Sequence, residues 1–174
     1  MAGFGCSLLD SEWAGRNARG AQMKSELIEM VRCELRSRLQ VLSKAALEAH
    51  AAATDPDSKA EGKYDTRSLE ASYLASGQAR QVEEMSEALR VFEAWEAVDF
   101  SMEEAVDAGA LVEVDVGGEG EWFLLAPASG GLVIEHQGCE VTLLAPESPL
   151  YQKLLGMRVG ETADGPQLMV MEIC

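Results

Sequence analysis

Two stretches of the chain carry apolar residues at the spacing of a coiled-coil seam, and this repeat limits the fold more than any other feature. In the first stretch, steps of three and four residues average 3.5, the period of helices that pack side by side. No Pro or Gly interrupts residues 23–53, so the pattern predicts a helix of about 30 residues and ~45 Å. The seam positions are Ile28, Val31, Leu35, Leu39, Leu42, Ala46 and Ala49.

A second seam follows after a break that contains a proline. Pro56 disfavours a helical conformation at the residue before it, Asp55. Two seams joined by a turn predict an antiparallel helical hairpin over residues 23–98, with its tip near residues 54–66. The positions of the second seam are Leu74, Gln78, Val82, Met85, Leu89 and Phe92.

The first 22 residues differ from the seams that follow them. They are rich in Gly and Ala and carry only a short apolar patch. We expect residues 1–22 to form a poorly ordered N-terminal extension. A short helix docked on the rest of the protein is the alternative.

The second half of the chain, residues 99–174, has the alternating pattern of β-strands. Apolar and polar residues alternate with a period of two between Gly-rich turns such as residues 117–118. Ser148 as N-cap, Pro149 at the first helical position and Gly156 at the end predict one short helix. We therefore predict an α+β protein in which the hairpin precedes a small antiparallel β-domain. The expected strands are residues 109–116, 122–127, 132–135, 139–145 and 167–174.

The net charge of the chain limits the kinds of partner that it can bind. The 174 residues carry a formal net charge of −16, from 30 acidic and 14 basic residues. Residues 99–174 hold 14 of the acids but only two bases, Lys153 and Arg158. Such a surface is unsuited to binding nucleic acid through its phosphates. Basic protein surfaces, or a site that requires acids or metal, fit the charge better.

Several classes of protein are disfavoured by what the sequence lacks. The four cysteines have no metal-ligand spacing with His50 or His136, so we expect free thiols in a reducing compartment. No apolar run reaches the length of a membrane span. No nucleophile, phosphate-loop or zinc-protease motif is present. These observations favour a cytoplasmic protein that is not itself an enzyme.

The run APESPLYQKLLGMRVGET, residues 145–162, resembles the C-terminal segment of the Gre family of bacterial transcription elongation factors. Tyr151 departs from the pattern, because that family usually has Gly there. The resemblance covers about residues 24–174, and it implies that the C-terminal domain is related to FK506-binding-protein (FKBP) folds. The matching residues are Pro146, Ser148, Pro149, Leu150, Leu154, Leu155, Gly156, Gly160 and Glu161.

This resemblance implies a role for the acidic tip. In the family, the hairpin enters the secondary channel of RNA polymerase, where two tip acids help to bind a second Mg²⁺ near the 3′ end of the nascent RNA. The polymerase then hydrolyses the backtracked transcript by a two-metal reaction. Tyr64 matches the tip tyrosine, which makes Asp57 and Glu61 the best candidates for the metal-facing acids, with Asp55 as a further one. Counted without gaps from Tyr64, the family Glu falls on Ala60, and one gap restores Glu61.

The resemblance also implies partner contacts and a monomer. The C-terminal domain docks on the polymerase in this family, and we assign Ser148, Pro149, Leu150 and Tyr64 to partner binding.

Other readings of the sequence stay open. The tip acids are alternatively helix caps or solvated turn residues. The hairpin then either occupies the channel and modulates or inhibits the polymerase without cleavage, or serves as a coiled-coil interaction module outside transcription. Prolyl isomerase activity is disfavoured, because Trp122 and Phe123 fall on opposite faces of one strand and do not line one pocket.

Overall fold

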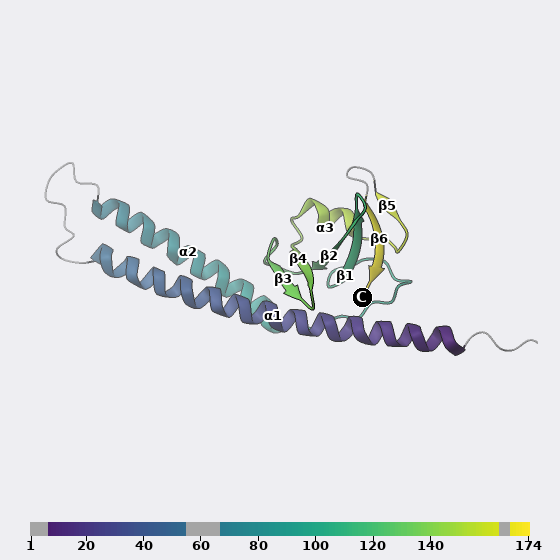
Figure 1. The fold of residues 1–174 in the computed structure, drawn as a ribbon. Coiled ribbons are helices and arrows are strands. Elements are labelled where there is room, and N and C mark those ends of the chain that lie inside the picture. The colour runs from purple at the N-terminus through teal and green to yellow at the C-terminus, as the bar shows by residue number, and fades with distance from the viewer. Residues whose placement is uncertain (1–6, 55–66, 164–167) are drawn as a thin grey trace, which may run out of the picture. The chain divides into compact units, whose positions relative to one another are not determined.

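A computed structural model describes residues 7–54, 67–163 and 168–174. The chain divides into two compact units. We call Arg32–Ala94 the hairpin unit, and Met1–Val31 together with Trp95–Cys174 the strand unit. The long helix α1 (Ser7–Thr54) contributes to both units, and α2 (Arg67–Ala94) belongs to the hairpin unit (Figure 1).

The hairpin unit is packed most tightly at its base. Leu35 and Phe92 are fully buried there, as the two seams predicted. Towards the tip, Leu39 is only half-buried and Leu74 is 59% exposed. The seam position assigned to Leu74 is therefore wrong. Gly77 follows three residues later and supplies no side chain to close the interface.

Two arginines of α1 secure the end of α2. Arg32 Nε donates a hydrogen bond of 2.8 Å to the carbonyl of Phe92, and Arg36 Nη2 lies 2.9 Å from Glu93 Oε1. The last turn of α2 contains no basic residue of its own. Because the last carbonyls of a helix have no partner within it, Arg32 supplies from α1 a donor that α2 lacks.

Helix α1 starts earlier than the sequence indicated. It begins at Ser7, so residues 7–22 are helical where we expected a poorly ordered extension. Gly15 and Gly20 each disfavour a helix by about 1 kcal/mol relative to Ala. A helix that is already nucleated downstream is extended at much lower cost than a new one is started, and this explains how the helix continues through both glycines.

Among its described residues, the strand unit has one mixed sheet of six strands in the order β3-β4-β2-β1-β6-β5. The α+β class is confirmed, and so is the short helix predicted in the second half, α3 (Pro149–Leu154). The β1–β2 turn at Gly117 and Gly118 is also confirmed, with φ values of 67° and 99°. The strands are β1 (Leu111–Val116), β2 (Glu119–Leu125), β3 (Val133–His136), β4 (Cys139–Leu144), β5 (Thr162–Ala163) and β6 (Leu168–Ile173).

One pairing corrects the prediction of an antiparallel sheet. Strands β2 and β4 are parallel, whereas the other four pairs are antiparallel. The reason is that β3 and β4 form their own hairpin, with positive φ at Gln137 and Gly138. The second strand of this hairpin, rather than the first, lies beside β2. The two-residue strand β5 is a further element that the sequence pattern did not indicate.

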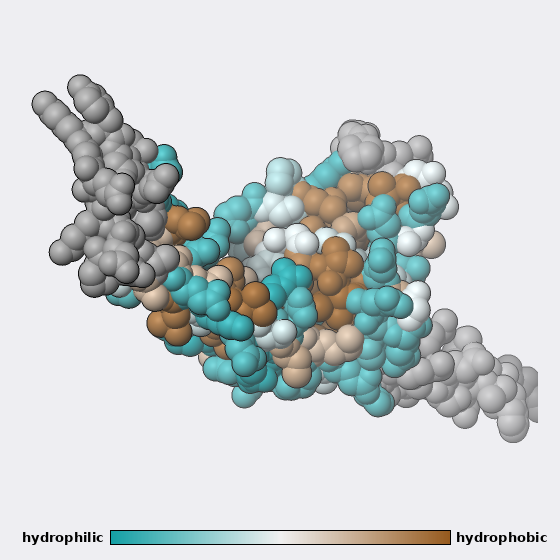
Figure 2. All heavy atoms as spheres, turned by 60° about the vertical axis from the view of Figure 1, so that its left-hand side comes forward, coloured by the Kyte–Doolittle hydropathy of each residue, from teal (hydrophilic) through white to brown (hydrophobic). Residues whose placement is uncertain are grey.

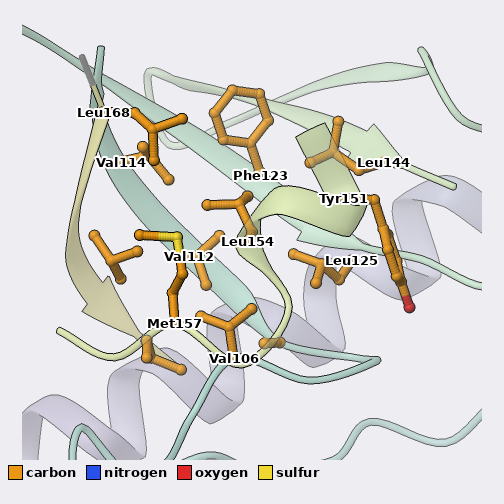
Figure 3. Packing of buried hydrophobic residues seen from close by; sticks show 13 residues of the cluster. Val106, Val112, Val114, Phe123, Leu125, Leu144, Tyr151, Leu154, Met157 and Leu168 are labelled. Atoms are coloured by element: carbon orange, nitrogen blue, oxygen red, sulfur yellow. The ribbon is translucent and has the colours of Figure 1, made fainter. Parts of the chain in front are cut away.

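Both faces of the sheet are buried over part of their area. On one face, α3 covers a cluster that includes Val112, Phe123 and Leu154 (Figure 3). On the other face, Leu111 and Leu124 are fully buried, and α1 approaches within the same unit. Glu26 Oε2 on α1 lies 3.1 Å from His136 Nε2 at the end of β3.

Hydrophilic side chains cover much of the surface shown in Figure 2, with hydrophobic residues exposed between them. In the strand unit, the larger exposed hydrophobic residues include Val98, Val133 and Met171. They come from three separate segments, namely the stretch between α2 and β1, strand β3 and strand β6.

Candidate functional site

The residues assigned to the acidic tip lie outside the described part of the chain. This holds for Asp55, Asp57, Glu61 and Tyr64, so the shared Mg²⁺ site stays a prediction. Within residues 7–54, 67–163 and 168–174, no group of three or more His, Cys, Asp or Glu side chains is placed to hold a metal ion.

The Gre-like run of residues 145–162 is described throughout, and its first part forms α3. Ser148 precedes the helix in an extended conformation, and Pro149 occupies the first turn, both as predicted. Pro149 suits this position because the first N–H groups of a helix have no acceptor within it. The Ser148 carbonyl accepts a 3.1 Å hydrogen bond from the Gln152 N–H, but the Ser148 hydroxyl makes no capping hydrogen bond.

The second part of the run contains two glycines after α3, and the backbone conformation explains why glycine occurs at both positions. Gly156 and Gly160 have φ values of 81° and 83°, a region that side chains other than Gly rarely adopt. The Gly156 N–H donates to the Val106 carbonyl at 2.8 Å, and the Gly160 N–H donates to the Val170 carbonyl at 2.8 Å. These bonds attach the end of α3 to the segment before β1, and the next turn to β6.

The apolar residues of α3 attach the helix to the sheet. Leu154 is fully buried, and Leu150 packs against the same cluster while half-buried. Tyr151, which stands where the Gre pattern has Gly, is 5% exposed and lies near Leu125 and Leu144 in Figure 3. Burial raises the pKa of the Tyr151 hydroxyl, and the charge of Asp107 raises it further. The tyrosine thus fills space in the core that a Gly would leave open.

The residues assigned to partner binding are brought together in part. Ser148, Pro149 and Leu150 are consecutive at the start of α3. Pro149 is exposed and Ser148 is half-buried, whereas Leu150 packs against the core cluster. At this end of α3 the proline ring is exposed and the Ser148 hydroxyl makes no capping bond, so the assignment of these residues to partner binding stays a prediction.

Lys24 is a residue that sequence reasoning missed. Its side chain is fully buried in the strand unit, its amine donates to the Val98 carbonyl, and Nζ lies 4.9 Å from the centre of the Phe100 ring. Burial lowers the pKa of this amine to about 8, while Asp99 and Cys174 act in the opposite direction. The missed signal is its spacing, because Lys24 precedes Ile28 by four residues and so continues the seam backwards.

Other sequence expectations can also be compared with the structure. Phe123 belongs to the core beneath α3. Trp122, the residue before it in the strand, points to the opposite face, so the two do not share a pocket. Cys33, Cys139 and Cys174 are free cysteines. Among the described helices, none is both long enough and apolar enough to cross a membrane.

Comparison with known proteins identifies structural neighbours only. No family model and no curated protein matches the chain. The GreA factor homolog 1 (Gfh1) protein of Thermus thermophilus is similar over 86% of this chain and 93% of its own, with 23% identity and a TM-score of 0.32. Gfh1 of Thermus aquaticus is similar over 88% of this chain and 95% of its own, with 21% identity and a TM-score of 0.32. Because such scores are low, these neighbours do not assign the chain to a family.

Proposed function

We propose that this chain is a Gre-like regulator that binds bacterial RNA polymerase and inserts its helical hairpin into the secondary channel. The observation that carries the proposal is the run of residues 145–162, which matches the Gre pattern at Pro146, Ser148, Pro149, Leu150, Leu154, Leu155, Gly156, Gly160 and Glu161. The order of the elements supports it, because a long helical hairpin is followed by an α+β region. In this role the chain is an accessory factor, and the polymerase performs the chemistry.

The tip sequence suggests how such a factor would act. Mg²⁺ prefers oxygen ligands in near-octahedral geometry and is often held by one or two carboxylates together with other groups. A short acidic segment alone would bind it weakly. Asp57 and Glu61, with Asp55 as a further candidate, would complete a metal site only when the acidic centre of the polymerase supplies the remaining ligands. The second ion would then assist hydrolysis at the 3′ end of the nascent RNA.

A second candidate is a channel-occupying regulator that does not stimulate cleavage. The tip sequence favours this alternative in two ways. Glu61 matches the family position only with a gap, and Lys59 and Lys63 reduce the local negative charge. Both candidates share the docking of the protein on the polymerase and differ only in the chemistry at the tip.

The deciding experiment uses stalled, backtracked elongation complexes made with the RNA polymerase of the source organism. Mg²⁺-dependent shortening of the transcript is measured with the wild-type protein and with an Asp57→Asn/Glu61→Gln variant. A Glu48→Gln/Glu83→Gln variant is the matched control, because it removes the same charge from exposed helix positions. Shortening by the wild type and the control, but not by the tip variant, supports the cleavage factor.

Binding is measured on the same complexes with a fluorescently labelled protein. Binding without shortening supports the channel-occupying regulator. Absence of binding at micromolar concentration refutes both candidates. Gel filtration then tests the remaining alternative, because a coiled-coil scaffold forms a stable oligomer whereas the proposed regulator is a monomer.

A further inference from the structure

A row of carboxylates crosses three neighbouring strands of the sheet. Glu135 on β3 lies directly opposite Glu140 on β4. Strands β2 and β4 are parallel, and Trp122 of β2 pairs with Val141 of β4. One residue earlier on both strands, the same register places Glu121 beside Glu140. Since alternate residues of a strand share a face, all three carboxylates lie on the same face as Phe123. We call Glu121, Glu135 and Glu140 the carboxylate row.

The carboxylate row forms no ion pair with any of the described residues. All three side chains are exposed. Like charges directly opposite each other in a sheet are destabilising. The arrangement therefore costs the fold stability and leaves negative charge available to a partner.

The row ends at an edge of the sheet. In the described residues, β3 is the terminal strand and pairs only with β4. Because alternate residues of an antiparallel strand bond to the neighbour, about half of the N–H and C=O groups of β3 face outwards. Val133 is 49% exposed and lies two residues before Glu135, so both side chains are on the face of the carboxylate row. The edge thus combines backbone hydrogen-bonding groups, one apolar side chain and negative charge.

We propose that the β3 edge binds an extended, basic segment of a partner protein, which adds to the sheet as a further strand. Backbone hydrogen bonds would provide the pairing, and side chains on alternate positions would provide the choice of sequence. A Lys or Arg of the added strand would lie beside Glu135, within reach of Glu140, and an apolar residue two positions away would cover Val133. The excess of acids over bases in residues 99–174 repels acidic segments. The proposal uses neither the tip acids nor the start of α3.

The test follows the backbone amide signals of the full-length, ¹⁵N-labelled protein by NMR. The probe is an eight-residue peptide with Lys and Val in turn at every second position and Thr between them. We expect the largest shifts at Val133 and Glu135. A peptide of the same composition, N-methylated at alternate backbone positions, should bind at least tenfold more weakly, because it lacks the donors for strand pairing.

The contribution of the row is tested with a Glu121→Gln/Glu135→Gln/Glu140→Gln variant. We expect this variant to bind the peptide about tenfold more weakly at low salt, the combined effect of several exposed charge pairs. The control Glu96→Gln/Glu103→Gln/Glu147→Gln removes the same charge from other exposed positions and should bind within about twofold of the wild type. Circular dichroism verifies that both variants are folded.

Three results would overturn the proposal. The first is no binding of the peptide, or shifts that do not include the β3 edge. The second is equal weakening in both triple variants, which would mean attraction by net charge alone. The third is equal binding of the N-methylated peptide, which would exclude strand addition.

Discussion

The buried amine of Lys24 predicts a specific dependence of stability on pH. In the unfolded chain this amine has an ordinary pKa of 10.5, and burial lowers the pKa to about 8 in the folded protein. Between these two values the unfolded chain binds more protons than the native protein. The contribution of Lys24 to the free energy of unfolding therefore rises with pH across this window.

The size of the effect follows from the two pKa values. Each pKa unit is worth about 1.4 kcal/mol, so lowering the pKa from 10.5 to about 8 corresponds to roughly 3 kcal/mol over the full window. About 2 kcal/mol of this change falls between pH 7 and pH 9.5. A Lys24→Met variant keeps much of the apolar side-chain volume but has no titrating amine, and it should lack this rise.

The assay is urea denaturation followed by tryptophan fluorescence at pH 7 and pH 9.5. The wild type should gain about 2 kcal/mol relative to Lys24→Met over this range. Lys44→Met is the control, because the Lys44 side chain is 79% exposed, and this variant should follow the wild type. Burial raises the pKa of Cys174 to about 11, and the charge of Lys24 lowers it. Lys24→Met removes that charge and so moves the Cys174 pKa further above the range of the assay. If the free energy of unfolding has the same pH dependence in the wild type and in Lys24→Met, the buried amine is not the cause of that dependence.

Three further substitutions test the packing and the charges, each by the free energy of unfolding. Gly130→Ala should destabilise the protein by about 1–3 kcal/mol, because the new Cβ would lie 2.8 Å from the Cβ of Ala145 and 3.0 Å from its nitrogen; an unchanged stability would show that this turn yields easily. Gly77→Ala should stabilise the hairpin by about 1 kcal/mol, because a Cβ there meets nothing within 4 Å; a loss would mean that the added methyl obstructs the hairpin. Glu140→Gln should add about 0.5 kcal/mol by removing the like charge opposite Glu135; a loss would show that another residue compensates that charge.

Local patterns in the sequence were sufficient for most of the elements. The 3.5-residue repeat identified both helices of the hairpin, and Pro149 located the start of α3, because these signals depend on neighbouring residues only. The same reasoning failed where the structure depends on distant contacts. The parallel pairing of β2 with β4 is one such case. Nothing in the alternation of either strand specifies which strand lies beside it.

The site was predictable to a smaller extent. Ser148 and Pro149 were identified from a sequence pattern, and the structure places both at the start of α3. Lys24 was missed because a lysine is normally assigned to the solvated face of a helix. Its burial depends on residues more than 70 positions away, at Val98 and Phe100. Extending the apolar repeat of the first helix towards the N-terminus would have identified Lys24 as a seam position, but it would not have identified Val98 and Phe100 as its partners.

The residues of the Gre-like run carry different weight as indicators of function. Gly156 and Gly160 adopt positive φ values, and Leu154 is fully buried, so the local fold by itself requires these three. Their presence therefore says little about what the protein binds. Pro149 is exposed and the Ser148 hydroxyl forms no capping bond, so these two side chains contribute less to the packing than the buried ones. If the proposed function is correct, substitutions at these two positions should weaken binding to the polymerase with little loss of stability.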